Sequence, residues 1–393
     1  MADYFDQAHA LFEYTRSLRR DFHRNPELGF KEFRTAGIVT RELNELGLEV
    51  TTGIARTGVV AMLEGGRPGP VIMLRFDMDA LPIQEETGAE YASQNPGVMH
   101  ACGHDGHTAV GLTVARILAA QRQTLPGAVK FVFQPAEEGL GGAESMVAEG
   151  VLENPSPQMC LGLHLWNNQP LGWLGIAPGP VMAASEVFSL IVKGKGGHGA
   201  LPNLAVDPVV ASAHIITALQ SIIARNVSPL QTAVVTVATV HGGGAHNVIP
   251  EEVHLTGTIR TFDAGVRQVV LKRFNEIIQQ TATALGCQVE IDVKSLTPAV
   301  VNDPAVTQLV HQVAESLLPK LTLDSQVSTM GSEDMAFYMG VIPGCFFFIG
   351  SANAEKGLDA PHHHPRFDVD EEALPVAAAL MSAAAVRLLE NPV

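Results

Sequence analysis

The sequence has a shortage of positive charge and lacks long apolar runs. Lys and Arg number 25 against 41 Asp and Glu, which gives a formal net charge of −16 over 393 residues. Because a nucleic-acid backbone or an anionic membrane would repel such a chain, neither is expected as a partner. No uninterrupted apolar run reaches the length of a bilayer span. The N-terminal segment also lacks the charged head and apolar stretch of a secretory signal.

The sequence also lacks a disulfide framework. Its four cysteines, Cys102, Cys160, Cys287 and Cys345, are widely scattered along the chain. This spacing favours a reducing, cytoplasmic location. Each cysteine is then available as a thiolate ligand or as a small buried residue.

Length and composition indicate a globular protein of two domains. A chain of 393 residues is too long for one ordinary domain. Hydrophobic residues make up 46% and charged residues 17%, which supplies enough material for a core. There is no internal repeat and no low-complexity segment.

The first part of the chain alternates short apolar runs with helical patterns. We expect strands near 58–63, 70–76, 128–134 and 159–166, and helices at 5–20, 33–47 and 107–122. Strands that are apolar almost throughout are typical of a mostly parallel sheet covered on both faces. Ligands of such α/β folds bind beyond the carboxyl ends of the strands, so catalytic and binding residues are expected there.

From about Ser185 the pattern changes to that of a compact inserted domain. Strands are expected at 185–194, 232–240, 251–262 and 287–296, with helices at 207–226 and 266–285. This order is βαββαβ, a ferredoxin-like arrangement. The prediction is therefore an α/β catalytic domain formed by 1–184 and 297–393, with an inserted domain at 185–296. The returning segment carries a helix from 304, a strand at 345–350 and a last helix from about 371.

Polar clusters follow the predicted strands or begin helices. They are His100–His107, Gln134–Gly139, Leu163–Trp166 and, far along the chain, Pro361–Pro365. A thiolate and an imidazole two residues apart on a glycine-bearing loop can reach one ion or bridge two. Adjacent carboxylates at a strand end point in different directions, so one can bind metal while the other shuttles protons.

The mixture of donors in these clusters suits a borderline-soft ion such as zinc, which accepts imidazole, carboxylate and thiolate together. Five donors exceed one tetrahedral site. They favour two ions about 3.5–4 Å apart that share a bridging ligand.

Each donor also has a structural interpretation. A histidine at a strand end, such as His164, is more often hydrogen-bonded than ligating, and Cys102 alone would be a small buried residue. The pair Glu137–Glu138 could begin a helix. The triplet His362–His364 could be an exposed loop. Together these interpretations require four independent coincidences, all where an α/β sheet places its active site.

Several longer runs resemble those of a known family. They are RRDFHRNPELGF, RFDMDALPIQEETG, MHACGHDGHT, FQPAEEGLGGA, GKGGHGALP, NVIPEEVHLTGTIRTF, GSEDMAFY and HHPRFDVDEEALP. The chain resembles the M20 metallopeptidases over nearly its whole length and in the right order. More narrowly it resembles their amidohydrolase branch, which includes hippurate hydrolases, N-acyl-amino-acid hydrolases and plant auxin-conjugate hydrolases.

The resemblance implies a role for each donor. Cys102 would bridge two metals in place of the aspartate common elsewhere in the family, and Glu137 would act as general base. The remaining ligands would be His104, Glu138, His164 and His363. The ions would be zinc or manganese, with cobalt or nickel as alternatives, two per subunit.

Two choices depend on the details of the family motifs. His363 is preferred to His362 because the family pattern His-x-Pro-x-Phe is matched from His363 onward. Arg75 stands where wider M20 enzymes have a metal-binding histidine, so it should not be a ligand. Asp77 would steady a ligating imidazole from behind, although Asp77 and Asp79 could equally cap strand ends.

In the inserted domain the resemblance implies a lid that also forms a dimer. His198 would stabilise the oxyanion, often across the dimer, while Asn247 and Arg260 would contact substrate, Arg260 gripping a carboxylate. The alternatives are a turn residue for Asn247 and a surface cation for Arg260. Family members often have histidine where this chain has Asn203, which leaves the substrate contacts open.

The expected function is hydrolysis of the amide bond of small N-acyl amino acids by a cytoplasmic homodimer or dimer-based oligomer. A dipeptidase or carboxypeptidase using the same two-metal site is a second hypothesis. A metal-dependent binding protein without catalysis is a third.

Overall fold

The computed structural model describes residues 4–392, so the two ends of the expected catalytic domain, residues 1–3 and 393, lie outside the described residues. The chain divides into two compact units. The second unit comprises Met182–Ala299 and Thr329–Glu333, and the first unit comprises the remainder. The boundaries expected after residues 184 and 296 lie within a few residues of these. The short segment Thr329–Glu333 was expected in the catalytic domain but groups with the inserted unit.

The first unit contains an eight-stranded mixed sheet in the order β1-β2-β4-β3-β5-β16-β6-β15. Its strands are β1 (Glu49–Ile54), β2 (Gly58–Glu64), β3 (Arg67–Asp77), β4 (Pro126–Gln134), β5 (Met159–Pro170), β6 (Trp173–Gly175), β15 (Thr322–Asp324) and β16 (Gly344–Ala352). The central strands β4, β3, β5 and β16 run parallel, which confirms the predicted α/β class. The sequence missed β1, which is mostly exposed, and β6 and β15, which are too short to show a period.

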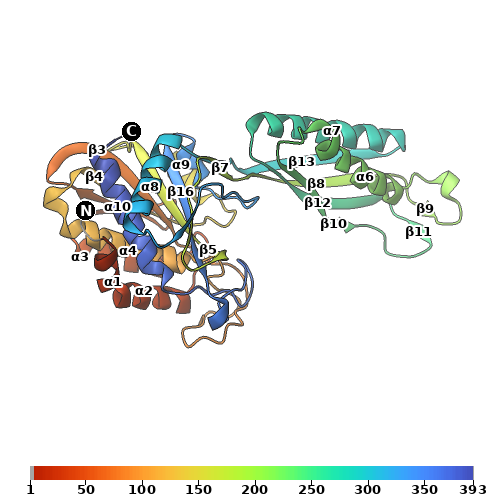
Figure 1. Cartoon of the computed structure of the whole chain (residues 1–393). Helices are drawn as coiled ribbons and strands as arrows, with labels where there is room; N and C mark the ends of the chain where they lie inside the picture. The colour runs from red at the N-terminus through yellow and green to blue at the C-terminus, as the bar shows by residue number, and fades with distance from the viewer. Residues whose placement is uncertain (1–3, 393) are drawn as a thin grey trace. The chain divides into compact units, whose positions relative to one another are not determined.

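Helices surround this sheet (Figure 1). They are α1 (Tyr4–Ala10), α2 (Phe12–Arg24), α3 (Phe33–Glu45), α4 (His104–Ala120), α5 (Gly142–Ala148), α8 (Pro304–Leu317), α9 (Ala336–Met339) and α10 (Ala373–Glu390). The expected helix at 5–20 is two helices that break at Leu11. Two short strands, β7 (Gly179–Met182) and β14 (Val300–Asn302), pair with each other outside the main sheet.

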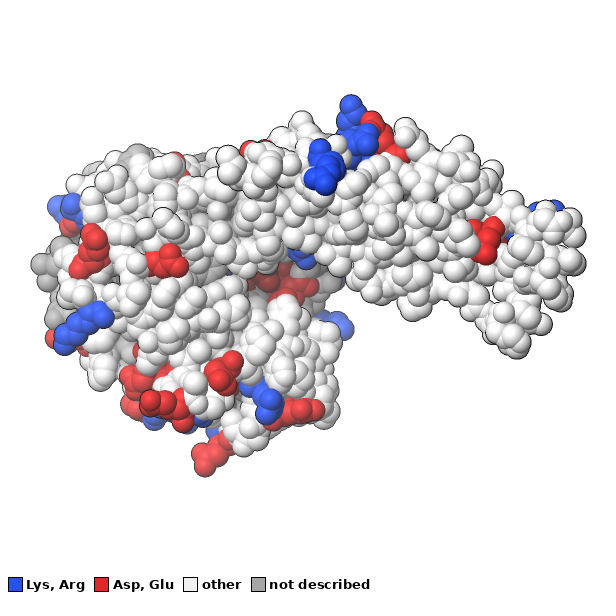
Figure 2. All heavy atoms as spheres, turned by 45° about the vertical axis from the view of Figure 1, so that its right-hand side comes forward, with Lys and Arg blue, Asp and Glu red and all other residues white. Residues whose placement is uncertain are grey.

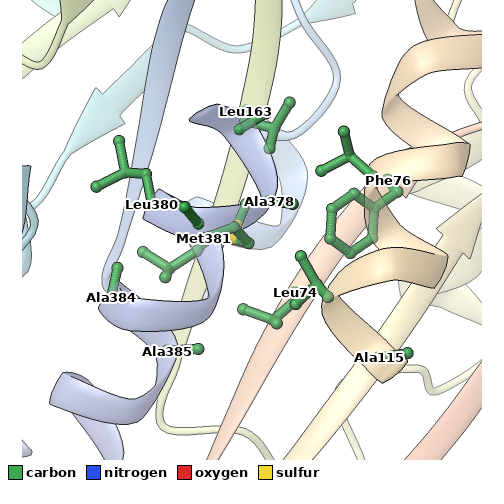
Figure 3. Close-up of a cluster of buried hydrophobic side chains, with 14 of the residues drawn as sticks. Leu74, Phe76, Ala115, Leu163, Ala378, Leu380, Met381, Ala384 and Ala385 are labelled. Atoms are coloured by element: carbon green, nitrogen blue, oxygen red, sulfur yellow. The ribbon is translucent and has the colours of Figure 1, made fainter. Parts of the chain in front are cut away.

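The core of the first unit lies between the sheet and helices α4 and α10. Figure 3 shows Leu74 and Phe76 of β3 and Leu163 of β5 facing Met381 of α10. The alanines of α10 lie on the same packed surface, and their small side chains let the helix lie close to the strands. This packing fixes the parallel strands whose carboxyl ends carry the polar clusters.

Helix α4 is buried on nearly all sides, and Gly111 permits its close approach to the sheet. A Cβ atom at Gly111 would lie 2.7 Å from ring carbons of Phe76 and 2.8 Å from the ring of Phe133. Real Cβ atoms do not approach so closely. The position therefore requires glycine despite its low helix propensity.

The second unit has the predicted βαββαβ order. It consists of β8 (Ala184–Lys193), α6 (Pro208–Asn226), β10 (Ala233–His241), β12 (Glu252–Thr261), α7 (Ala264–Ala284) and β13 (Gln288–Thr297). The strands form an antiparallel sheet in the order β10-β12-β8-β13, and α6 and α7 pack together on one face (Figure 1). Asp207 and Asp263 cap the two helices. An additional small ladder joins β9 (Gly197–His198) to β11 (Val248–Ile249).

Within residues 4–392, two helices, α6 and α10, are long and apolar enough by length and composition to cross a membrane. Both helices contain polar residues, so neither is the uninterrupted apolar run that would have indicated a span from the sequence. Most of α10 is buried in the core, as expected for a central helix of an α/β domain. Length and composition alone therefore do not assign a membrane span here.

The two mid-helix glycines Gly111 and Gly37 offer a matched test of the packing. A Cβ at Gly37 on α3 would meet nothing within 4 Å, so Gly37→Ala should stabilise the protein by about 0.5–1 kcal/mol. Gly111→Ala gains the same propensity but meets Phe76, and should destabilise by about 1–3 kcal/mol. Urea unfolding monitored by circular dichroism measures both. Equal effects of the two substitutions would contradict the close packing of α4.

Candidate metal centre

The five predicted donors come from four segments near the carboxyl ends of β3, β4 and β5. Cys102 and His104 flank Gly103, which takes a left-handed conformation with φ 90° at the start of α4. Glu138 lies in the turn after β4, His164 lies on β5, and His363 lies in the loop before α10. The topology thus brings the donors to one edge of the sheet, where α/β folds bind ligands.

The donor atoms form overlapping groups. Cys102, His104 and His164 have ligand atoms within 4.8 Å of one another, and so do Cys102, Glu138 and His363. Cys102 belongs to both groups. Its Sγ lies 3.5 Å from His164 Nε2, and Glu138 Oε1 lies 3.3 Å from His363 Nε2 and 4.0 Å from His104 Nε2. Ligands about 2.0–2.3 Å from a tetrahedral zinc ion are separated by about 3.3–3.8 Å, so these spacings suit a shared thiolate between two ions.

Two of the imidazoles are held with a lone pair toward the cluster. His104 donates its Nδ1–H to the carbonyl of Asp79 at 2.9 Å, and His164 donates its Nδ1–H to the carbonyl of Leu165 at 2.7 Å. In the neutral form of each ring, Nε2 is therefore the nitrogen that keeps a lone pair. His104 Nε2 is buried and has no hydrogen-bond partner among the described residues. A buried acceptor without a donor fits a metal ion.

The alternation of side chains along β5 explains the position of His164. Leu163 and Leu165 belong to the hydrophobic core, so His164 between them points to the opposite face of the sheet. There its ring packs edge-on against Trp166 and His362. The strand therefore places one imidazole at the cluster and leaves little freedom to its ring.

The electrostatics of the cluster favour a cation. Burial alone would lower the pKa of His104, but Asp77, Asp79 and Glu138 outweigh it and raise this pKa to about 10. Burial and the nearby Glu138 also raise the pKa of the Cys102 thiol well above its usual value. These two groups thus hold their protons strongly. A divalent cation that bound to them would replace the protons and release them. The donors present therefore fit a pair of metal ions.

Arg75 and Asp77 form a buried network behind the cluster. Arg75 donates to Asp77 Oδ2 at 2.5 Å and to Asp334 Oδ1 at 2.8 Å. Asp77 accepts the Nδ1–H of His107 at 2.6 Å, whereas His104 Nδ1 lies 3.9 Å away. Asp77 therefore steadies a histidine next to the cluster rather than bonding to one of the predicted ligands.

Asp79 has a more direct role than the sequence indicated. One of its oxygens lies 3.3 Å from His104 Nδ1. Its two oxygens also accept the backbone N–H groups of Glu137 and Glu138, at 3.0 and 3.1 Å. One carboxylate thus orients a predicted ligand and both glutamates. The sequence offered only its position after a strand as a signal.

Both members of the pair His362–His363 reach the cluster. His363, with φ 64°, donates its backbone N–H to the carbonyl of Ala101 and places its ring by Glu138. His362 Nε2 accepts the N–H of Asn167 at 3.1 Å, so its Nδ1 carries the proton and faces Cys102 Sγ at 3.9 Å. Burial lowers the pKa of His362 to about 3, which keeps it neutral. The sequence gave no signal for this contact, because it depends on the course of a loop.

A buried ion-pair network joins the segments that carry the donors. Arg19 of α2 donates to Asp105 Oδ2 at 2.8 Å and to Asp368 Oδ1 at 2.5 Å. His23 also bonds Asp105, and although burial and Arg19 oppose it, this carboxylate and Glu85 raise the pKa of His23 to about 9. Asp105 follows His104 in α4, and Asp368 lies in the segment before α10. The network therefore anchors both segments to α2.

In the second unit, His198 and Asn247 are neighbours. His198 on β9 is exposed and pairs with Val248, and the carbonyl of Asn247 accepts the N–H of Gly199 at 2.8 Å. Both lie beyond the end of the four-stranded sheet at which Glu252 pairs with Lys193 (Figure 1). Asn203 lies in an exposed turn.

Arg260 lies near the opposite end of the same sheet. It is half-buried on β12, pairs with Ser185 and donates to the Ser332 hydroxyl at 2.8 Å. It lies eight positions along β12 from Glu252, which is about 27 Å at 3.4 Å per residue. One copy of this unit therefore brings His198 and Asn247 together but keeps Arg260 far from both.

The sequence matches the profile of the family described as Peptidase family M20/M25/M40 over residues 73–387. An IAA-amino acid hydrolase ILR1-like 4 of Arabidopsis thaliana is 41% identical, with 96% of this chain and 86% of the relative covered. An N-acetyl-L-cysteine deacetylase of Bacillus subtilis is 40% identical over 95% of this chain and 88% of the relative. A thermostable carboxypeptidase 2 of Saccharolobus solfataricus is 36% identical over 94% of each chain.

A solved structure extends the similarity to three dimensions. The YxeP protein of Bacillus subtilis, described as a dinuclear metal-binding peptidase, superposes with a TM-score of 0.84 at 36% identity. The match covers 97% of this chain and 99% of that one. The fold and the family therefore agree over almost the full length.

The histidine triplet provides a matched test of the metal centre. His363→Ala should lower the metal content of dialysed protein, because it removes a donor next to Glu138. His364→Ala should leave the content unchanged, since His364 belongs to none of the candidate groups. Elemental analysis of the two variants beside the parent protein makes the comparison. Equal metal content in all three would reject His363 as a ligand.

Proposed function

The chain belongs to the M20 peptidase family of metal-dependent amidohydrolases and peptidases, and we propose that it hydrolyses the amide bond of N-acyl-L-amino acids. The products are a carboxylic acid and a free amino acid. The observation that carries the proposal is the cluster of five donors with a second carboxylate, Glu137, beside it. The names of the relatives support the substrate class, since they refer to an amino-acid conjugate and to N-acetylcysteine.

We assign the metal ligands from the same cluster. Cys102 is the ligand shared by two ions, and the others are His104, Glu138, His164 and His363. Zinc or manganese is the expected ion, with cobalt or nickel as alternatives, because the donor set mixes soft and hard atoms. When bound, such ions lower the pKa of a water molecule and polarise a carbonyl group.

Glu137 is assigned as the general base. Its carboxylate lies in one group with His104 and Glu138 while its backbone is bonded to Asp79. Glu138 is occupied as a ligand, which leaves Glu137 to take a proton from water and deliver it to the leaving amine. A base held at a fixed backbone position can serve both proton transfers without moving far.

Substrate contacts are assigned to the second unit. His198 donates to the developing oxyanion, an interaction worth about 3–4 kcal/mol when one such donor is lost. Asn247 contacts the substrate beside it, and Arg260 binds the free carboxylate. An acyl amino acid is much shorter than the separation between Arg260 and the pair His198–Asn247 within one unit. This separation supports a homodimer in which the partner supplies His198 and Asn247.

A second candidate function is that of a carboxypeptidase or dipeptidase. The same metal centre would cleave any amide that the site can bind, and one relative is named a carboxypeptidase. The free carboxylate bound by Arg260 is common to both substrate classes. The group on the other side of the amide therefore distinguishes the two functions.

We also propose that the protein acts in the cytoplasm, on small molecules. All four cysteines are free and buried, as is usual in a reducing compartment. On the face shown in Figure 2, several Lys and Arg side chains lie beside carboxylates rather than gathering into one basic surface. Together with the negative net charge, this does not favour binding to nucleic acid or to an anionic membrane.

Glu137→Gln tests the proposed chemistry. The variant should keep its metal and its fold while kcat falls by about 10²–10⁴-fold, because the proton acceptor is lost. Glu144→Gln on α5, an exposed carboxylate nearby, serves as control. The substrates are N-acetyl, N-benzoyl and N-indolylacetyl amino acids beside dipeptides with a free amine. Substantial activity of Glu137→Gln would reject the base, and a preference for free dipeptides would favour the second function.

Subunit complementation tests the shared active site. Glu137→Gln and His198→Ala should each be inactive alone. Co-expressed with different tags, they should regain up to about a quarter of the parent activity, because half of randomly paired dimers contain one complete site. Two differently tagged copies of Glu137→Gln provide the control. An inactive mixture despite purified heterodimer would show that His198 acts within its own chain.

A further inference from the structure

The turn that carries Glu137 and Glu138 is held in an unfavourable conformation. Ala136, directly before them, is buried and has φ 54°, in the left-handed region that residues with a Cβ rarely adopt. Such a conformation is unfavourable and persists only where surrounding contacts enforce it. The contacts of this turn therefore fix the backbone positions from which the side chains of Glu137 and Glu138 extend.

Two carboxylates from distant segments bind three successive backbone N–H groups of this turn. Ala136 N–H donates to Glu32 Oε1 at 2.9 Å, while the next two N–H groups donate to Asp79. The second oxygen of Glu32 accepts the Thr57 hydroxyl at 2.6 Å. Glu32 and Asp79 are both buried. Of the two carboxylates, Glu32 is the one that binds the N–H of Ala136, the residue with the left-handed conformation.

Glu32 is not needed to cap its own helix. It stands at the N-cap of α3, yet its side chain makes no capping hydrogen bond. The carboxylate of Glu27 instead accepts the first N–H groups of that helix, from Arg34 at 3.0 Å and Thr35 at 2.8 Å. The side chain of Glu32 is therefore directed to the turn at Ala136 and to Thr57.

The position of Glu32 is costly for a carboxylate. Burial raises its pKa to about 7, hydrogen bonds from Thr57 and Ala136 partly offset this, and Asp79 adds repulsion. The Thr57 hydroxyl and the Ala136 N–H, which donate to its two oxygens, carry no positive charge. Local costs of this kind are expected where a residue serves a functional site.

We propose that Glu32 is a positioning residue for amide hydrolysis, holding Ala136 in the left-handed turn that directs Glu137 to the substrate. The proposal rests on the proposed role of Glu137 as base. Glu32 touches neither substrate nor metal and acts only through the backbone. A reacting group misplaced by about 1 Å can lose about 100-fold in rate.

The central experiment combines a loss with a rescue. Glu32→Ala should lower kcat by about 100-fold, with KM and metal content changing less than about twofold. Adding Ala136→Gly to this variant should raise its kcat about tenfold, because glycine adopts a positive φ without the hydrogen bond to Glu32. Glu32→Gln keeps an acceptor oxygen for the Ala136 N–H, so its kcat should stay within about threefold of the parent.

Glu149→Ala is the matched control. Glu149 also accepts a backbone N–H, from Ala55 at 2.8 Å, and Ala55 also has a positive φ of 48°. This contact lies on a different turn, so kcat should remain at the parent value. A loss equal to that of Glu32→Ala would mean that any such contact supports the fold, and would overturn the proposal.

Hydrogen exchange separates this proposal from the role of Glu137. The peptide that contains Ala136–Glu138 should exchange faster in Glu32→Ala and return toward the parent rate with Ala136→Gly. Faster exchange with unchanged kcat would overturn the positioning role while leaving the result for Glu137→Gln intact. A loss of kcat that Ala136→Gly does not restore would also overturn it. If Glu32→Ala fails to fold, a tenfold or greater loss of kcat in folded Glu32→Gln decides against the proposal.

Discussion

The structure depends on the balance of charge in a cluster of buried acids and imidazoles at the end of a parallel sheet. Asp77, Asp79 and Glu138 surround His104, and the field of these carboxylates is strong enough to hold a proton on a fully buried ring. Buried charges of one sign are tolerated only when a partner compensates them. Arg75 compensates part of this charge from behind, and a pair of cations would compensate the rest at the donors.

The sheet makes this concentration of charge possible. Parallel strands packed between helices bring residues distant in sequence to one edge, and the close approach of α4 at Gly111 sets the position of the loop that carries Cys102 and His104. The ion pairs of Arg19 then tie the start of α4 to the segment before α10. The donors are therefore supported by groups that do not themselves reach a metal, which is how binding sites keep their geometry.

Much of this could be predicted from the sequence, because the strongest signals are local. The apolar runs that became β3, β4 and β5, and the βαββαβ order of the second unit, follow from side-chain periodicity. Glu138 follows β4 and Cys102 precedes α4, as expected, whereas His164 lies within β5, which continues past the expected end of that strand to Pro170. What could not be predicted depends on contacts between segments far apart in the chain. These are the contact of His362 with Cys102 and the binding of the Ala136 turn by Glu32, which lies 104 residues earlier. The segment Thr329–Glu333, which joins the second unit, likewise has no local signal.

The most direct test of this account is anomalous diffraction from crystals of the metal-loaded protein, measured on either side of the absorption edge of the metal. If Cys102 is shared by two ions, the map should show two peaks about 3.5–4 Å apart, both within about 2.3 Å of Cys102 Sγ. The other protein ligands should be His104, Glu138, His164 and His363. A single peak, or two peaks that leave Cys102 Sγ bound to neither ion, would contradict it.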